Sequence, residues 1–571
     1  MTLHLSIFLW LPAAAGVLGL LSRSDKLARA LAVLGALGSL GYAITAVVDY
    51  DRDTGGLQYV TDRTWISELG IHYKLGLDGL NLFLILLTAV LFLAAILWSM
   101  RTPIERERHY WLHLGIGQTA VLGALMAQDL ALFVAFFDLM LIPFFFLTIG
   151  WSTAESKTGA VLKLVIYTLV GSLLMLVAAI GIAVLTKDAS GNDLTFVLSD
   201  LTATTLPEGT QDWIFLCFAA AFLVKMPAFP FHGWMPDGYK AMPLPVLAVF
   251  SGVLSKVAAY GFLRIVCPTL PDAAVEFQTL MLIIGLLSIV YGSAVAFTTT
   301  NARLILGYSS LAQLGFILLG VFALNPQGAQ GAILQSVNHG LVVAPAFFLV
   351  ALAAERARGS EDIRDMGGLA FKAPIIAVLF LIVALANLAI PGSSNFVGEF
   401  FILLGVFNAK VAIAAIAFTG VALASVYSLR LFIRVMHNRT GAETEGREIS
   451  VRDGLVLVPL VLAIIALAFY PQLALQKGEK DITGAVATAF EKSDPEQFAK
   501  ETGGSAEPAA AQAVTPGAGA GQAIDPATGA PAGGQAVQID PQTGLPIDPN
   551  TGQPIQIDPD QLPAEAQEVT P

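Results

Sequence analysis

The chain has 571 residues, of which 56% are hydrophobic and only 13% are charged, and its mean hydropathy is +0.71. A soluble globular domain carries about 25% charged residues. The composition therefore excludes an ordinary soluble enzyme and indicates an integral membrane protein with many spans. The net charge of −12 is misleading, because residues 501–571 hold nine acidic residues and no Lys or Arg, so residues 1–500 are nearly neutral.

About fourteen apolar segments have roughly the 17–25 residues that a transmembrane helix needs. The first, "MTLHLSIFLWLPAAAGVLGLL", lacks the basic start of a signal peptide, so we expect a retained helix whose N-terminus lies outside. The connections are short, and the longest lie at 49–79 and 186–211. The expected spans are 4–21, 27–48, 80–99, 110–127, 129–150, 160–185, 212–229, 244–264, 274–297, 303–323, 330–353, 374–407, 411–434 and 453–470.

Basic residues are unevenly shared between the two ends of the expected spans. Before the C-terminal region, alternate connections contain eighteen Lys and Arg residues at one end and six at the other. Basic connections tend to stay in the cytoplasm. We therefore expect the richer end to be cytoplasmic and both termini to face outward, as in a multi-pass protein of the bacterial cell (inner) membrane.

Residues after about 500 differ in composition from the rest of the chain. The imperfect repeats "IDPATGAP", "IDPQTGLPIDPNTGQP" and "IDPDQLP" are rich in Pro, Gly, Gln and Ala. They carry too little apolar surface to offset the entropy lost on ordering. Disorder is therefore predicted for residues 501–571, and a tether to the cell wall or to a partner is the alternative interpretation.

Five titratable residues lie where expected spans cross the bilayer interior. A charge there costs roughly 2.5–3.5 kcal/mol on insertion scales, so such residues usually have a function. Lys163 is left out because it lies near the end of its span and can reach the surface. Buried ion pairs that only hold helices together are the alternative, but two lysines and two carboxylates on four spans favour a proton relay. The five are Asp138, Lys225, Lys256, His339 and Glu399.

Two of these spans are interrupted beside a titratable residue. "VKMPAFP" places Pro227 and Pro230 after Lys225, and "AIPGSSNFVGE" places Pro391 shortly before Glu399. Proline removes a helix hydrogen bond, and at membrane depth the freed groups need protein or water around them. The broken spans are the seventh and the twelfth, and an odd offset of five reverses the topology. This pattern predicts two inverted five-helix repeats, as in many transporters.

The expected fold is therefore an all-α polytopic membrane protein with about fourteen helices, two of them broken. We expect N-terminal helices one to three in residues 1–109, a first five-helix repeat in 110–270 and a second, inverted repeat in 271–440. The last transmembrane helix and a C-terminal extension would occupy 441–500, followed by the Pro/Gly-rich acidic tail at 501–571.

Several short motifs resemble those of one family. "FHGWMPD", "SGVLSKVAAYGFLR", "NHGL", "DMGGL", "PGSSNFVGEF" and "SVYSLR" are similar to motifs of the antiporter-like subunits of respiratory complex I, the proton-translocating NADH:quinone oxidoreductase. The resemblance covers about residues 70–440 and is specific, because the motifs keep their order and spacing. It is nearest to the M-type subunit, which has a glutamate at the position of Glu399, where the L and N subunits and antiporter relatives usually have lysine.

The resemblance implies a role for each of the five residues. Asp138, where the family more often has Glu, would stabilise a proton on Lys225, and the proton would pass through Lys256 and His339 to Glu399 and then outward. Two loops, "MPDGYKAMP" and "ERARGSEDIRDMGGL", lack histidines that are often found there, which leaves the route of proton entry open.

The resemblance also places the redox chemistry elsewhere. Flavin, iron–sulfur clusters and quinone would belong to partner subunits, and the neighbouring antiporter-like subunits L and N would contact this chain within the membrane. The sequence shows no cysteine cluster, Gly-rich dinucleotide loop or haem motif, so no cofactor is expected here. Cys217 and Cys267 lie in or beside apolar segments and are expected to be buried thiols.

Three features of the interpretation remain open at this point. Ser393, Ser394 and Asn395 are expected either to orient water near the second break or to cap the helix that follows. A subunit of a multi-subunit sodium/proton antiporter would share the fold and the relay, and copurifying subunits distinguish it. A membrane scaffold without transport would tolerate neutral substitution at Lys225. An intramembrane hydrolase or transferase is disfavoured, since no nucleophile–base set stands out.

Overall fold

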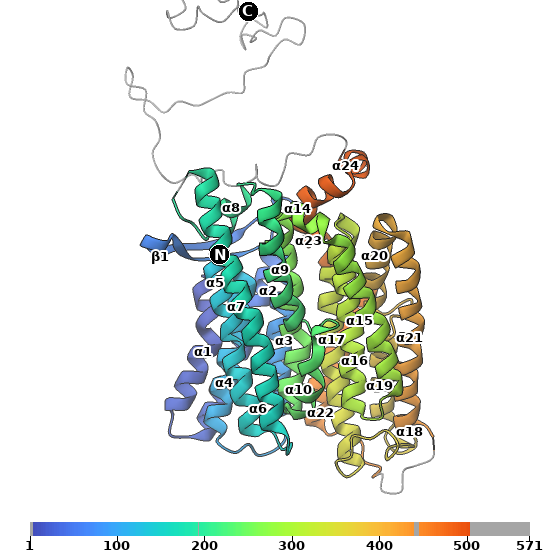
Figure 1. Ribbon diagram of the computed structural model, residues 1–571. Coiled ribbons are helices and arrows are strands. Elements are labelled where there is room, and N and C mark those ends of the chain that lie inside the picture. Colours follow the sequence, from blue (N-terminus) through green and yellow to red (C-terminus); the bar gives the residue numbers. More distant parts are fainter. Residues whose placement is uncertain (1–3, 192, 439–444, 503–571) are drawn as a thin grey trace, which may run out of the picture. The chain divides into compact units, whose positions relative to one another are not determined.

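The computed structural model describes residues 4–191, 193–438 and 445–502, and within these ranges a helical segment lies at each of the fourteen expected positions. Figure 1 shows these segments packed lengthwise as a bundle. Their bounds are α1 (Leu5–Leu21), α2 (Asp25–Asp49), α3 (Leu82–Ser99), α4 (Glu107–Met126), α5 and α6 (Leu130–Leu139 and Leu141–Trp151), α7 (Lys157–Ser190), α9 (Glu208–Lys225), an eighth span that begins with α11 (Leu244–Val249), α15 (Gln278–Thr298), α16 (Ala302–Phe322), α17 (Pro326–Arg356), α19 and α20 (Pro374–Asn387 and Ser394–Ala409), α21 (Val411–Met436) and α22 (Val451–Phe469).

Ten of the helices in the described part of the chain are long and apolar enough to cross a membrane. The remaining expected spans are α1, α4, α9 and the pair α19–α20. Of these, α9 carries charged residues at both ends, and the break divides α19 from α20 into two shorter helices. The prediction of a mainly helical, multi-pass membrane protein is confirmed.

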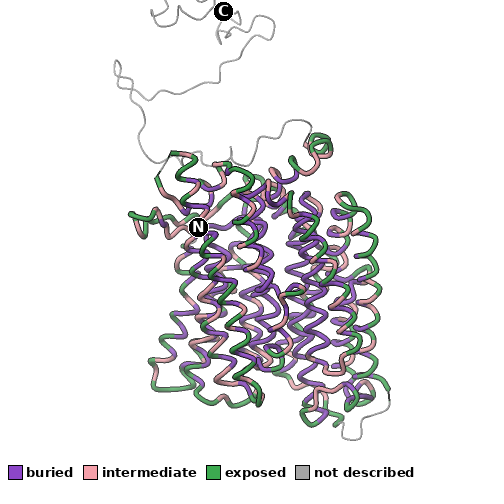
Figure 2. The backbone as a smooth tube through the Cα atoms, in the orientation of Figure 1, coloured by how far each residue is buried: buried purple, intermediate pink, exposed green. Residues whose placement is uncertain are grey.

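The centre of the bundle is formed by the eighth span, α16 and α17. Every residue in the apolar stretch of each is buried, whereas only a third of the corresponding stretches of α21 and α22 is buried. Figure 2 shows the same arrangement, with buried backbone in the interior and exposed backbone along the outer helices. The relay residues expected on the eighth span and α17 therefore lie in the protein interior and away from lipid.

Both predicted breaks are present. The seventh span stops at Lys225, and after an irregular stretch the chain continues as the short helix η2 (Phe231–Trp234) and α10 (Met235–Ala241). The twelfth span is interrupted between Asn387 and Ser394. The segment "MPDGYKAMP", expected to be a loop, is largely helical in α10, because Pro236 stands in the first turn, where proline fits a helix.

The eighth span is irregular in a way that the hydropathy does not predict. Its α12 (Ser255–Gly261) lies between two π-helical segments, η3 (Phe250–Leu254) and η4 (Phe262–Val266), and the span ends with α13 (Cys267–Thr269). π-Helical turns inside helices occur frequently at functional sites. Lys256 stands in this short α-helical segment.

The long connection at 49–79 contains a β-hairpin that was not expected. β1 (Gln58–Ile66) and β2 (Ile71–Leu77) pair antiparallel, joined by η1 (Ser67–Leu69). The turn closes at Gly70, whose φ of 60° suits glycine, and a Cβ there would lie 1.8 Å from the carbonyl oxygen of Leu194. Gly70 thus lets the hairpin pack against the connection that follows α7.

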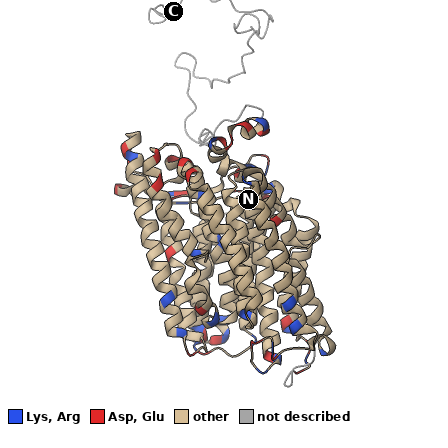
Figure 3. Cartoon of the chain, turned by 45° about the vertical axis from the view of Figure 1, so that its right-hand side comes forward, with Lys and Arg blue, Asp and Glu red and all other residues tan. Residues whose placement is uncertain are grey.

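The described structure is completed by the short helices α8 (Leu198–Thr202), α14 (Pro271–Glu276), α18 (Leu369–Lys372) and α24 (Pro495–Thr502) and by the long helix α23 (Gln472–Ser493). Helix α23 packs against α13, α14 and α17. Helices α8 and α24 lie toward the same end of the bundle in Figure 1, and charged residues gather at the two ends with few between them (Figure 3). The predicted disorder of the acidic tail concerns residues outside the described ranges.

Candidate functional site

The first pair of relay residues meets at the break in the seventh span. Lys225 is the last residue of α9 and is buried. Its ammonium donates to the carbonyl oxygen of Phe137 over 3.2 Å and lies 4.4 Å from the centre of the Phe137 ring. Asp138 is the next residue on α5, and its carboxylate interacts electrostatically with the Lys225 ammonium. The structure therefore places the first carboxylate where its charge acts on the first lysine, although the two residues form no ion pair or hydrogen bond with each other.

The second pair consists of Lys256 on the eighth span and His339 on α17. Their side chains are 1% and 0% exposed, and their charges interact. The Lys256 ammonium donates to the carbonyl oxygen of Ser251 and, over 3.3 Å, to the hydroxyl of Ser255. Both ring nitrogens of His339 lack a hydrogen-bond partner in the described structure. A neutral imidazole in this position carries a proton on one nitrogen and can accept another proton on the second nitrogen.

Glu399 lies in the second turn after the break in the twelfth span and is 3% exposed. Its carboxylate oxygen Oε1 accepts a hydrogen bond from Gln313 Nε2 on α16 over 2.7 Å, and Gln335 Nε2 on α17 lies 3.5 Å from the same oxygen. Gln335 Nε2 also donates to Gln313 Oε1 over 2.7 Å. Two buried amides therefore hold the carboxylate between three helices.

The sequence analysis did not identify these two glutamines. Gln335 precedes His339 by four residues on α17, and residues four apart share a helix face. The face that presents His339 to Lys256 therefore also presents Gln335 to Glu399. The signal in the sequence was weak, because placing a glutamine in an apolar helix costs less free energy than placing a charge there. Many buried amides also serve only to join helices.

The residues at the second break do not cap the following helix. Ser393 is the residue before α20, and its side chain makes no capping hydrogen bond. In the described structure the hydroxyls of Ser393 and Ser394 and the amide of Asn395 are buried without a partner, while Asn338 donates to the carbonyl oxygen of Ser394 over 2.7 Å. The capping interpretation is wrong, because the chain enters α20 with these side chains turned elsewhere.

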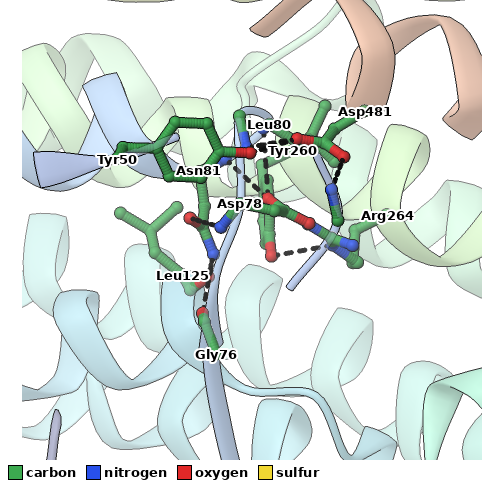
Figure 4. A network of polar contacts seen from close by, with 11 residues as sticks. Tyr50, Gly76, Asp78, Leu80, Asn81, Leu125, Tyr260, Arg264 and Asp481 are labelled. Carbon is green, nitrogen blue, oxygen red and sulfur yellow. Dashed lines mark hydrogen bonds and ion pairs between the residues drawn. The ribbon is translucent and has the colours of Figure 1, made fainter. Parts of the chain in front are cut away.

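A second polar cluster, drawn in Figure 4, lies where α3 begins and the eighth span ends. Arg264 forms a buried ion pair with Asp78 and donates from Nε to the hydroxyl of Tyr260 over 3.0 Å. Asp481 on α23 accepts a 2.6 Å hydrogen bond from the hydroxyl of Tyr50. Burial and this hydrogen bond raise the pKa of Tyr50, which therefore remains a neutral donor. The cluster ties α23 to the membrane helices.

Replacement of Arg264 by methionine is expected to destabilise the protein by roughly 3–5 kcal/mol, because the Asp78 carboxylate would stay buried without its cation. The double variant Arg264→Met/Asp78→Asn should recover part of this loss, since asparagine can still accept the backbone hydrogen bonds from Leu80 and Asn81. The dissociation temperature of the purified complex measures both effects. Unchanged stability of Arg264→Met would show that this ion pair does not stabilise the protein.

No group of three or more His, Cys, Asp or Glu side chains that could hold a metal ion occurs among the described residues. The relay residues are instead lysine, histidine and isolated carboxylates, together with neutral amides and hydroxyls. Such a set can accept and pass protons, because each titratable member lies beside another charge or a hydrogen-bonding side chain.

A mainly helical bundle with two interrupted helices and a buried series of titratable residues defines an antiporter-like membrane protein. The family described as "NADH:quinone oxidoreductase/Mrp antiporter, TM" matches residues 127–424. The chain belongs to this family, which confirms the resemblance inferred from the motifs.

Individual relatives cover most of the chain. NADH-quinone oxidoreductase subunit M of Rhodobacter capsulatus is 35% identical over 489 residues, which are 82% of this chain and 93% of the relative. The solved structure of respiratory complex I from Thermus thermophilus with bound NADH contains a chain with 32% identity and a TM-score of 0.77, covering 85% of this chain and 98% of that one. The Mrp complex from Dietzia sp. DQ12-45-1b contains a chain with a TM-score of 0.73, 88% and 99% coverage and 22% identity, a likeness of fold alone.

Proposed function

We propose that this chain is the M-type antiporter-like subunit of a proton-translocating NADH:quinone oxidoreductase. The observation that carries the proposal is the series formed by the partly buried Asp138 and the buried Lys225, Lys256, His339 and Glu399, which extends from one broken helix to the other. The 35% identity to a relative named as subunit M supports the M-type assignment. The glutamate at position 399 agrees with it.

In the proposed mechanism Lys225 carries a proton at the first break, and the charge of Asp138 stabilises it. A change in their separation, or in a charge on a neighbouring subunit, weakens this stabilisation and releases the proton toward Lys256. His339 accepts it next, because it lies within the reach of the Lys256 charge and its ring nitrogens have no hydrogen-bond partner in the described structure.

Transfer from His339 to Glu399 would follow the shared face of α17. Gln313 and, over a longer distance, Gln335 donate hydrogen bonds to the Glu399 carboxylate and orient it toward this face. Buried polar groups are normally satisfied by protein or ordered water, so Ser393, Ser394 and Asn395 are the side chains available to bind water beside the break. A proton leaves Glu399 through these groups.

The inverted-repeat organisation belongs to the same proposal. Residues 110–270 would form one five-helix repeat and 271–440 the other, with the breaks after Lys225 and before Glu399 at corresponding places. A break in each repeat gives both halves a polar site at membrane depth, as inverted-repeat transporters require.

The partners follow from the proposed function. The chain would lie in the membrane arm between the antiporter-like subunits L and N, and flavin, iron–sulfur clusters and quinone would be bound by other subunits. The alternative of a sodium/proton antiporter subunit shares the fold. Copurification of the native chain with flavin- and iron–sulfur-containing subunits supports the complex I assignment, and copurification with antiporter subunits alone contradicts it.

The proposed orientation in the bacterial cell membrane gives a direct prediction. Single cysteines replacing the exposed residues Arg106 and Arg364 should react with a membrane-impermeant thiol reagent only from the cytoplasm, and one at Asp53 only from outside. The two native cysteines are replaced by alanine beforehand. Labelling at Arg106 in intact cells would reverse the orientation. The expected outward position of Ala520 concerns a residue outside the described ranges.

A further inference from the structure

A polar cavity of about 530 Å³ lies beside the beginning of α22, at the end of the bundle that is rich in basic residues. Its wall includes Arg101, Arg447 and Arg452. Arg101 contributes no free positive charge, because it pairs with two carboxylates, Glu355 of the same wall over 2.9 Å and Asp453 over 2.5 Å. This pairing leaves the other two arginines as the cationic part of the wall.

Arg447 and Arg452 are exposed, and their guanidinium groups make no hydrogen bond or ion pair with any residue that the structure describes. The carbonyl oxygen of Arg447 accepts a hydrogen bond from the buried Arg356, whose charge offsets the second of the two carboxylates that face Arg101. The cavity thus presents two cations and can accept an anion.

An apolar groove of about 460 Å³ continues from the polar cavity along α22. The two share Ser450 and Val451 in their walls, and the groove is further lined by Gly454, Leu455 and Val458. Val451, Leu455 and Val458 follow helical spacing and are exposed, so they form an apolar stripe leading from the arginines into the membrane-spanning part.

We propose that the cavity and groove together bind one anionic phospholipid. The phosphate of its headgroup contacts Arg447 and Arg452, and an acyl chain lies along Val451, Leu455 and Val458. An anion at one end and a hydrocarbon chain at the other match the charged and apolar halves of this surface. Basic residues near the membrane surface attract anionic lipids, and this inference does not depend on the proton relay.

The test uses the purified complex that contains this subunit, in nanodiscs of phosphatidylcholine. Trace phosphatidylglycerol or phosphatidylcholine carrying a diazirine in the acyl chain is photolysed, and labelled peptides are identified by mass spectrometry. Phosphatidylglycerol is expected to label residues 451–458 in preference to phosphatidylcholine, and inorganic phosphate is expected not to compete. In Arg447→Gln/Arg452→Gln this preference should fall by roughly tenfold or more.

Two further variants separate the contribution of the apolar groove from that of other cations at the same end of the bundle. Gly454→Phe should reduce phosphatidylglycerol labelling by filling the groove, since the added side chain has space beyond the contact with Ile449 at 3.7 Å. Arg23→Gln/Lys26→Gln removes two exposed cations from the same end and should leave the preference unchanged. Equal labelling by both lipids, competition by phosphate, or no labelling because a partner protein covers α22 would each overturn the proposal.

Discussion

Lys225→Ala is expected to leave the complex assembled but to reduce proton transfer through this subunit by roughly two orders of magnitude, the low end of what a positioned proton carrier contributes. The ammonium of Lys225 faces Asp138 and stands at the first break, so its loss removes the proton carrier whose charge Asp138 stabilises. Electron transfer should also slow if it is tightly coupled to translocation. Quinone reduction and proton movement in vesicles measure both.

Lys163→Ala is the matched control for this variant. Lys163 lies half-exposed on α7 and pairs with Asp237 over 2.6 Å, near the end of the bundle. An exposed pair of this kind contributes at most about 1 kcal/mol to stability, and the residue lies outside the proposed relay. Lys163→Ala should therefore translocate protons normally, and equal loss in both variants would indicate a general structural defect.

Glu399→Gln is expected to reduce proton transfer as severely as Lys225→Ala, by interrupting the relay at its other end. The amide keeps the shape of the side chain and can still accept the hydrogen bond from Gln313, so folding should be preserved. It cannot take up a proton. Proton translocation in vesicles, normalised to the amount of assembled complex, measures the effect.

Two substitutions show whether titration at position 399 is responsible. Glu399→Asp should retain part of the activity, because the shorter acid can still take up and release a proton. Glu276→Gln neutralises an exposed acid at the end of α14 and should have no effect. Full activity of Glu399→Gln would exclude a titrating role for this carboxylate.

Hydropathy and charge predicted the membrane-spanning helices and the titratable residues within them. Segments of about twenty apolar residues become helices because a bilayer offers no hydrogen bonds to the backbone. A lysine or carboxylate within such a segment is conspicuous because it is costly there. For this reason Lys225 and Glu399 could be identified before their neighbours were known, and Pro227 and Pro391 indicated where the helices break.

The hydrogen-bonding partners of these residues could not be predicted in the same way. Gln313 and Gln335 are neutral, and their contact with Glu399 depends on how α16, α17 and α20 pack. The π-helical segments on either side of Lys256 have no simple pattern in the sequence. Both features arise from tertiary packing, which a single sequence does not display.

Contacts between residues that lie far apart in the sequence were also not predicted. Asp78 and Arg264 are 186 residues apart, one in a long connection and the other at the end of the eighth expected span, yet they form a buried ion pair. The hairpin β1–β2 was not predicted because its strands carry charged residues such as Asp62 and Lys74, which pair across the strands over 3.5 Å. Such short polar strands in a long connection resemble an irregular loop.

The ratio of protons translocated to electrons transferred, measured in vesicles that contain the assembled complex, tests the relay most directly. The account predicts a clearly lower ratio, or a matched loss of both activities under tight coupling, in Lys225→Ala and in Glu399→Gln, with normal values in Lys163→Ala and Glu276→Gln. Normal ratios at normal rates in both Lys225→Ala and Glu399→Gln would contradict the relay and favour a membrane scaffold with buried charges.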